Sequence, residues 1–302
     1  MGRRPPEPRN ASNPHRSPVL LTLKEYGWSI GPGAPLAVIA GINVLEDLDL
    51  ALTIGSALKE SCAALGLPYM FKASFDKANR SSIKSYRGPG LDQGLEQLAA
   101  VKEKLGVPVC TDIHEPDQAA RVAEIADLIQ IPAFLCRQTD LVRAVAEAAE
   151  AKDKLIQVKK AQFLAPWDCK NIVSKIGEVT KTERVILCER GASFGYNNLV
   201  VDMLGIGEMK KLGTPVTIDA THAVQLPGAD PRTAGASTGG RREGVAVIAR
   251  SAVAAGADGV FLEFHTDPDK ALCDGPSCLA IETAKPLLTT LKQLHEITAA
   301  AS

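Results

Sequence analysis

Short apolar runs rich in β-branched residues alternate along the chain with longer amphipathic stretches. The longer stretches carry apolar residues three and four positions apart, which predicts helices at 49–65, 94–105, 138–149 and 244–256, among others. The short runs are typical of buried strands, and their alternation with helices predicts a parallel sheet. The eight predicted strands are LAVIAG (36–41), PYMFKAS (68–74), PVCTDI (108–113), DLIQIP (127–132), KLIQVKK (154–160), RVILCER (184–190), PVTIDATH (215–222) and GVFLEFH (259–265).

Eight strand and helix repeats predict an α/β protein with a (β/α)8 TIM barrel as a single domain over residues 19–302. A doubly wound sheet is the alternative, but it would place a Gly-rich loop after the first strand, where AGINVLE (40–46) has one glycine. The segment 29–36, with TLKEYGW before it, predicts a short N-terminal hairpin at the bottom of the barrel. Residues 1–18 are Pro-rich and basic, which predicts a disordered tail, although a transit peptide is the alternative.

The composition narrows the partners of the chain. Its 302 residues carry a net charge of only -1, which offers no general attraction to nucleic acid or to a membrane surface. No apolar run approaches the roughly 18 residues that a membrane helix needs. The seven cysteines form no CxxC pair, which favours reduced thiols and a cytoplasmic location. We expect small-molecule substrates, and neither nucleic acid nor membrane as a partner.

The segment KASFDKANRSS (72–82) combines ammonium, guanidinium, hydroxyl and amide groups directly after the second predicted strand. Phosphate recognition needs this mixture, because the cations supply charge and the short donors fix orientation. A solvated basic loop is the alternative, but Asp76 is the only acid here and the cations do not alternate with Glu. The segment is therefore predicted to bind phosphate.

Polar side chains follow all eight predicted strands, and the active site of a (β/α)8 enzyme lies at the carboxyl ends of its strands. The strand-end cations exceed what one monoanion requires, which predicts two phosphorylated ligands, or a phosphate and a carboxylate. These cations are Lys72, Lys77, Arg80, Arg137, Lys159 and Arg190. Lys160 follows Lys159 and is expected to point to the opposite face of the sheet as a structural residue. For His114 and His265 two roles remain as alternatives, one in the site and one as hydrogen-bonded parts of the scaffold.

Several ordered motifs resemble those of the 3-deoxy-D-manno-octulosonate 8-phosphate synthase family, from about Ala37 to Leu291. They are KASFDKANRSS, SYRGPG (85–90), TDIHEP (111–116), QIPAFLCRQTDL (130–141), VKKAQF (158–163), CERGASFGYNNLVVDM (188–203), DATHAVQ (219–225), GGRRE (239–243) and CDGPS (273–277). The resemblance implies a transferase that forms a C–C bond. It condenses phosphoenolpyruvate, D-arabinose 5-phosphate and water to the eight-carbon sugar acid phosphate and inorganic phosphate, toward the inner core of lipopolysaccharide. It also implies a homotetramer without a cofactor.

The resemblance assigns roles to individual residues. Phosphoenolpyruvate is expected at Lys72, Ser74, Ala133, Lys159, Gln162 and Arg190, and the pentose phosphate at Lys77, Asn79, Arg80 and Ser81. The implied catalytic group comprises Asn43, Lys77, Asp112, His222, Glu263 and Asp274, and Gln130, Phe134 and Gln225 complete the substrate-binding set. Arg137 is expected to reach into the site of a neighbouring subunit. Gln157 stands where Asn is expected, a change that would reshape the pentose pocket.

Some members of this family bind a divalent metal through Cys, His, Glu and Asp, a set suited to a transition metal. Here His222, Glu263 and Asp274 match three of the four ligands, but Asn43 stands in the place of the cysteine. A neutral amide is a poor substitute for a thiolate, so the chain resembles the metal-independent branch and no metal site is expected. Cys273, beside Asp274, is the alternative source of a thiolate ligand.

Two other functions stay open. One is the related synthase that joins phosphoenolpyruvate to erythrose 4-phosphate in the aromatic pathway, although KANRSS and the missing metal cysteine favour the pentose enzyme. The other is a non-catalytic phosphosugar-binding barrel, which predicts gaps among the strand-end cations where none is evident. The stretches 168–175 and 226–243 have the composition of mobile loops, and the second is expected to cover the site.

Overall fold

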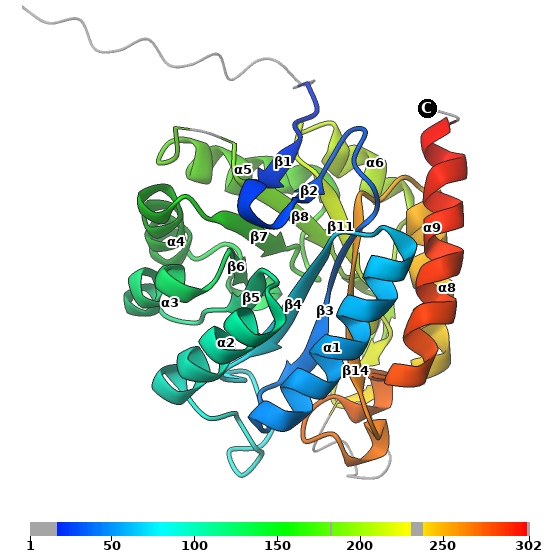
Figure 1. Cartoon of the computed structure of the whole chain (residues 1–302). Helices are drawn as coiled ribbons and strands as arrows, with labels where there is room; N and C mark the ends of the chain where they lie inside the picture. The colour runs from blue at the N-terminus through cyan, green and yellow to red at the C-terminus, as the bar shows by residue number, and fades with distance from the viewer. Residues whose placement is uncertain (1–16, 182, 231–237, 301–302) are drawn as a thin grey trace, which may run out of the picture.

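The computed structural model describes residues 17–181, 183–230 and 238–300. Eight parallel strands form a closed ring in which each strand pairs with the next along the chain, and the last pairs with the first. In Figure 1 the strands lie inside the molecule and the helices lie around them. They are β3 (Ala37–Val44), β4 (Tyr69–Ser74), β5 (Val109–Asp112), β6 (Leu128–Ile131), β7 (Leu155–Lys159), β8 (Val185–Glu189), β11 (Val216–Asp219) and β14 (Gly259–His265). The predicted (β/α)8 barrel is confirmed, and the open sheet is excluded.

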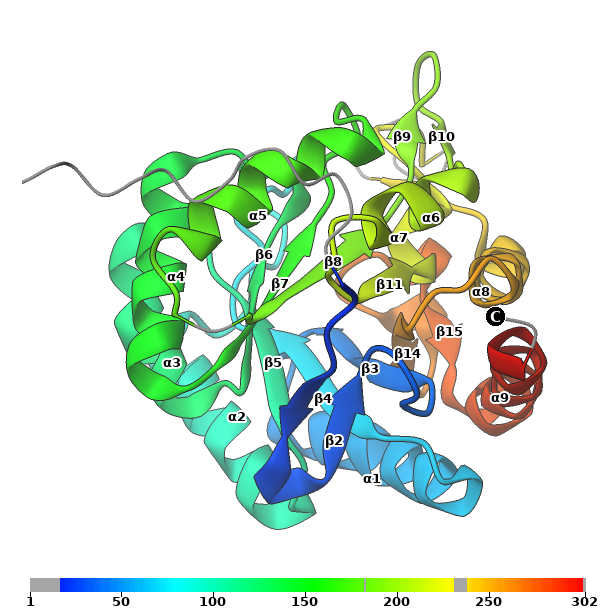
Figure 2. The ribbon, with the colours of Figure 1, turned by 90° about the horizontal axis from the view of Figure 1, so that it is seen from above.

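Helices surround the barrel and cover the outward side of the sheet (Figure 2). They are α1 (Leu48–Leu65), α2 (Leu91–Leu105), α3 (Ala119–Ile125), α4 (Thr139–Lys152), α5 (Cys169–Gly177), α6 (Leu204–Lys210), α8 (Val245–Ala254) and α9 (Ala284–Ala300). Helix α1 begins after Asp47, whose carboxylate accepts a hydrogen bond of 2.7 Å from the Leu50 amide, and it ends at Gly66 in the left-handed conformation. No helix among these described residues combines the length and apolarity that crossing a bilayer requires.

One predicted strand end and one predicted loop were wrong. The seventh strand ends at Asp219, and the next four residues form the short helix α7 (Ala220–Ala223), in which the Asp219 carboxylate accepts a hydrogen bond from the His222 amide. The stretch 168–175 is not a mobile loop, because most of it lies in α5. The apolar residues Ile172, Val173 and Ile176 of this helix recur at helical spacing and are buried under it. The other expected loop, 226–243, falls partly outside the described residues.

Side chains along the barrel strands alternate between the helix-facing side and the inside of the barrel, where the apolar ones form two separate clusters. On β7, Ile156 and Val158 belong to the cluster beneath the helices, whereas Leu155 belongs to the cluster inside the barrel. The same alternation directs Gln157 and Lys159 into the barrel. The carboxyl-terminal residues of the strands therefore bring inward-facing polar groups together at one mouth of the barrel.

A short antiparallel hairpin closes the opposite mouth (Figure 2). Its strands are β1 (Leu21–Leu23) and β2 (Trp28–Ile30), so the predicted hairpin is confirmed, although its second strand ends well before residue 36. Leu21, Trp28 and Ile30 pack with the inward side chains of the barrel strands. The predicted tail lies outside the described residues, apart from residues 17 and 18.

Smaller strands complete the described part of the chain. They are β9 (Ala192–Ser193), β10 (Leu199–Val200), β12 (Gln225–Leu226), β13 (Gly239–Gly240) and β15 (Leu279–Ala280). Strands β9 and β10 pair with each other, as do β12 and β13, and β15 adds to the end of β14. These pairs shape the loops around the polar mouth of the barrel.

Candidate active site

A cavity of about 630 Å³ opens at the carboxyl ends of the strands, and most of the predicted site residues line it. They are Lys72, Lys77, Asn79, Arg80, Ser81, Asp112, Gln130, Ala133, Phe134, Lys159, Gln162, Arg190, His222, Gln225 and Asp274. Asn43, Ser74 and Glu263 are buried and contact lining residues. Arg137 is exposed and does not line the cavity.

Lys72 connects several groups beneath this cavity. Its Nζ donates to Glu263 Oε1 at 2.8 Å, to Ser74 Oγ at 3.0 Å and to the Asn43 carbonyl at 3.2 Å. Burial favours the neutral amine, but Glu263 and Asp112 outweigh it and hold the pKa of Lys72 above its usual value. Burial also opposes ionisation of Glu263, yet His222 and Lys72 lower its pKa to about 2. Both groups are therefore charged at neutral pH.

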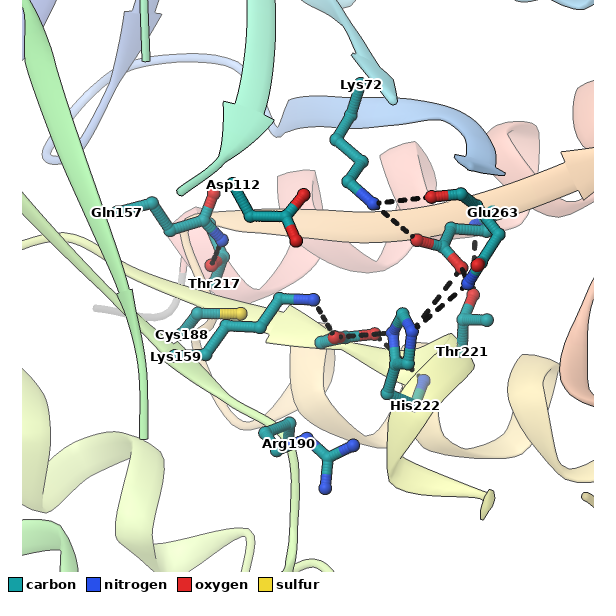
Figure 3. Close-up of polar contacts among 12 residues, drawn as sticks. Lys72, Asp112, Gln157, Lys159, Cys188, Arg190, Thr217, Thr221, His222 and Glu263 are labelled. Atoms are coloured by element: carbon teal, nitrogen blue, oxygen red, sulfur yellow. Dashed lines mark hydrogen bonds and ion pairs between the residues drawn. The ribbon is translucent and has the colours of Figure 1, made fainter. Parts of the chain in front are cut away.

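Lys159 and His222 share one buried carboxylate, that of Asp219 at the end of β11. Lys159 Nζ lies 2.6 Å from Asp219 Oδ2, and His222 Nδ1 lies 2.8 Å from the same oxygen. Lys159 Nζ also lies 3.8 Å from the centre of the Phe261 ring. Although burial opposes the charge, His222 and Lys159 lower the pKa of Asp219, while Asp219 and Glu263 raise that of His222. Figure 3 shows Lys159 and His222 pointing toward each other, Lys159 from β7 and His222 from the short helix α7.

Arg190 approaches the cavity from the end of β8 (Figure 3). Its Nη2 donates to Gln225 Oε1 at 2.9 Å, and its Nη1 is buried without a partner among the described residues. Burial lowers the pKa of this guanidinium from its ordinary value, without bringing it near neutrality. An unpaired buried cationic donor is costly, so this nitrogen is well suited to an anionic ligand.

Asp112 occupies the end of β5 and lines the cavity. It accepts a short hydrogen bond from Ser74 Oγ, and its Oδ2 lies 3.3 Å from His114 Nε2. Burial opposes its ionisation, but Lys72, His114 and Lys77 hold the pKa of Asp112 well below its usual range. His114 thus belongs to the site, whereas His265 does not line the cavity and accepts a hydrogen bond of 2.9 Å from the Asp267 amide.

Asn43 lies between the three residues that match metal ligands in the resemblance. Its Nδ2 donates to Glu263 Oε2 and, at 3.1 Å, to Asp274 Oδ2, and lies 3.4 Å from His222 Nε2. The ionised carboxylates attract the N–H donors, so the amide oxygen points away from them. This donor set does not fit a resident metal, because the amide nitrogen occupies the centre of the three groups. Within the described residues, no cluster of His, Cys, Asp and Glu has an arrangement that would hold a metal.

The phosphate segment divides between a strand and a loop. Lys72 and Ser74 belong to β4 and are buried, whereas residues 75–90 form a loop without helix or strand. In this loop Asn79 and Ser81 are exposed, and Arg80 donates to the Leu272 carbonyl at 3.3 Å and to Cys273 Sγ. The loop reaches the cavity from its rim, and the strand reaches it from below.

Some expectations need correction or extension. Gln157 does not line the cavity, because it is buried inside the barrel and donates to Thr217 Oγ1 at 3.2 Å. Lys160 faces away from Lys159 as predicted, and lies 3.4 Å from Glu189 Oε1. Asp219 was not among the predicted site residues, although its inward position at the end of its strand matches that of Lys159 and was the available signal. All seven cysteines are buried and free.

The fold and the cavity define a (β/α)8 protein with an anion-binding site at the carboxyl ends of its strands. The chain belongs to the DAHP synthetase I family, whose family model matches residues 16–300. It is 53% identical over 276 residues to the 2-dehydro-3-deoxyphosphooctonate aldolase of Hahella chejuensis. The aligned region covers 91% of this chain and 95% of that protein.

Proteins of the same name from two other bacteria are similarly close. The one from Desulfosudis oleivorans is 54% identical over 269 residues, 89% of this chain and 93% of that protein. The one from Nitratidesulfovibrio vulgaris strain Hildenborough is 55% identical over 260 residues, 86% of this chain and 92% of that protein. The family model spans the whole barrel, so its match includes both the strand ends and the loops that form the cavity.

Proposed function

We propose that this protein is an enzyme that condenses phosphoenolpyruvate with D-arabinose 5-phosphate and water. The products are 3-deoxy-D-manno-octulosonate 8-phosphate and inorganic phosphate. The main support is that two groups of cations, one at the strand ends and one on the loop 75–90, meet in one cavity. Its relatives named 2-dehydro-3-deoxyphosphooctonate aldolase support the same reaction.

Phosphoenolpyruvate carries a phosphate beside a carboxylate, and the strand-end group suits it. We assign its binding to Lys72, Lys159 and Arg190, with Ser74 orienting Lys72 and with Ala133 and Gln162 in the wall of the cavity. Arg190 Nη1 is a donor without a protein partner among the described residues, and a phosphate or carboxylate oxygen would satisfy it. Gln130, Phe134 and Gln225 line the same cavity and are assigned to substrate binding.

The loop group suits the pentose phosphate. Lys77, Asn79, Arg80 and Ser81 supply charge and short donors at the rim of the cavity, where a terminal phosphate would lie. The aldehyde end of the sugar would then point down toward Asp112 and His222, which line the cavity closer to the barrel. In this proposal the aldehyde would lie between the loop group and the strand-end group.

In the reaction, C3 of phosphoenolpyruvate attacks the aldehyde carbon, water adds at C2, and the phosphate leaves from C2. Lys72, Lys159 and Arg190 would stabilise the charge that develops during these steps. Asp219 holds Lys159 and the Nδ1 side of His222, so that His222 Nε2 faces Asn43, Glu263 and Asp274. Lys77 and Asp112 complete the proposed catalytic group.

We infer that the reaction needs no resident metal, since the Asn43 amide fills the space between Glu263, Asp274 and His222. We further propose a cytoplasmic homotetramer that acts toward the inner core of lipopolysaccharide. Arg137 is exposed and lies outside the cavity of its own chain, which is compatible with a role in the site of a neighbouring subunit.

The choice of aldose phosphate tests this function. The purified protein is supplied with phosphoenolpyruvate and either arabinose 5-phosphate or erythrose 4-phosphate, and the release of inorganic phosphate is measured. We expect turnover with the pentose and little with the tetrose. Turnover with erythrose 4-phosphate alone would reject the proposal in favour of the aromatic-pathway reaction, and no turnover with either would favour a binding protein.

A further inference from the structure

The loop 75–90 carries the cations and donors assigned to the pentose phosphate, yet it contains no helix or strand of its own. Its ends meet between β4 and α2, where the Lys77 amide donates to the Arg87 carbonyl at 2.7 Å and the Gly90 amide donates to the Phe75 carbonyl at 3.1 Å. Tyr86 Oη donates to the Leu45 carbonyl at 2.8 Å, which anchors the second end of the loop beside β3. The loop is therefore closed at its base.

A side-chain ion pair spans the same base. Arg87 Nε donates to Asp76 Oδ1 at 2.8 Å, and Arg87 Nη2 makes a second, short contact with Asp76 Oδ2. Two parallel contacts between a guanidinium and a carboxylate fix the orientation of both groups. Gly88 allows the two ends to approach, since it has a φ of +117° and a Cβ there would lie 2.4 Å from the Phe75 carbonyl oxygen.

Asp76 is the only acid in the phosphate segment, and neither it nor Arg87 is among the residues that line the cavity. A carboxylate this close to a phosphate-binding loop weakens the attraction for a phosphate by its charge alone. Its presence needs another explanation, and the paired contact with Arg87 provides one. The carboxylate acts on the shape of the loop.

We propose that Asp76 and Arg87 are positioning residues that form a clasp, which holds the loop in the shape that binds the phosphate of the aldose substrate. The inference rests on the proposed function of this site. An unfastened loop of this length would populate many arrangements, and the substrate would have to order it on binding. The clasp removes part of that ordering from the binding step. Its loss should therefore weaken the binding of the aldose phosphate more than the binding of phosphoenolpyruvate.

The sign of the effect separates this role from simple electrostatics. If the two residues act only through charge, Asp76→Asn should lower the KM for arabinose 5-phosphate and Arg87→Met should raise it. If they form a clasp, both substitutions should raise this KM, by about three- to fivefold for a well-oriented exposed pair. The KM for phosphoenolpyruvate and kcat should change by less than about twofold in both variants.

A double-mutant cycle sharpens the test. The variant carrying both Asp76→Asn and Arg87→Met should be no worse than either single variant, since one interaction is lost only once. Asp92 and Arg121 offer a matched control, because they form an exposed ion pair between α2 and α3 and do not line the cavity. Asp92→Asn and Arg121→Met should leave both KM values unchanged.

Hydrogen exchange of the substrate-free protein gives a readout that does not depend on activity. Backbone amides of residues 77–86 should exchange faster in Asp76→Asn and Arg87→Met than in the wild type and in the control variants. Opposite signs of the two KM effects, or unchanged exchange in this loop, would overturn the clasp. Lack of turnover by the wild type with phosphoenolpyruvate and arabinose 5-phosphate would overturn the proposed function, and exchange would still decide whether the clasp exists.

Discussion

Two groups of cations face the same cavity, and the protein holds them in different ways. Lys72, Lys159 and Arg190 are at most 6% exposed, stand at or beside the ends of barrel strands, and each bonds to a buried partner. In the loop group Lys77 is also buried, at 8% exposed, but Arg80 is only half-buried and Asn79 and Ser81 are exposed. The strand group takes its geometry from the hydrogen-bonded barrel, whereas the loop group needs fastening of its own. The first group is therefore suited to fine placement and the second to selection of a substrate.

The positive charge of the strand-end group is partly neutralised within the protein. Lys72 faces Glu263 and Lys159 faces Asp219, so much of the positive charge at the strand ends is balanced by buried carboxylates. An anion that binds there competes with these carboxylates for the same ammonium groups. Its binding energy is consequently smaller than the number of cations suggests, while its orientation is more strictly defined.

The largest effect is expected from removing a strand-end cation. Lys159→Met takes away charge next to the proposed phosphoenolpyruvate site and leaves Asp219 paired with His222 alone. Removal of one preorganised charged donor typically costs about 10²–10³-fold in rate, so we expect kcat/KM to fall by about that factor. Steady-state kinetics with both substrates measures it.

Lys160→Met is the matched control for this substitution. Lys160 is the next residue but faces away from the cavity, toward Glu189. Its loss should lower the free energy of unfolding by a few kcal/mol, roughly 3, because it leaves a buried carboxylate without its cation. The KM for phosphoenolpyruvate of the folded protein should stay within about threefold. An equal loss of kcat/KM in the two variants would contradict the division between inward and outward faces.

A smaller and more selective effect is expected from the loop. Arg80→Met should raise the KM for arabinose 5-phosphate by roughly tenfold, the value of one charge-assisted hydrogen bond to phosphate. The KM for phosphoenolpyruvate should change little, since this substrate is assigned to the strand ends. Equal changes in both KM values would show that the two groups do not bind separate substrates.

The difference between the two regions also explains what the sequence reveals. Side chains along the strand KLIQVKK alternate in direction with a period of two residues, which separates Lys159 from Lys160. The structure places these two lysines on opposite faces as predicted. The barrel follows from eight such strands, because parallel strands with intervening helices have few ways to close. The inward residues at strand ends were thus predictable from local pattern and topology together.

The partners of these residues were not predictable in the same way. Contacts such as Lys159 to Asp219 join residues 60 positions apart in sequence numbering, and they depend on side-chain conformations in a closed ring. Helix α5 was missed because Lys, Asn and Ser among its apolar residues resemble a loop composition, although Ile172, Val173 and Ile176 show helical spacing. The spacing of the apolar residues therefore predicts this helix better than the amino-acid composition of the stretch does.

Acid should lower the free energy of unfolding, because the strand-end region contains a buried carboxylate that must stay ionised. The pKa of Asp112 is lowered well below its ordinary value of 3.8, so its contribution to stability is complete above that value and is lost as the pH falls through the lower folded-state pKa. We expect the free energy of unfolding of the wild type to fall below pH 4 by more than about 1 kcal/mol beyond the loss in Asp112→Asn. Denaturant titrations between pH 5 and pH 2 measure this difference, and parallel curves would contradict it.

The smallest effect, none at all, is expected on removing divalent metals. The N–H donors of Asn43 face Glu263 and Asp274, and the nitrogen lies 3.4 Å from His222 Nε2, so the amide makes the contacts that a cation would make between these groups. Dialysis against a chelator should therefore leave kcat and both KM values unchanged. Loss of activity that a divalent ion restores would show that the strand-end region binds metal despite Asn43. Its precise geometry would then depend on an ion in addition to the buried ion pairs.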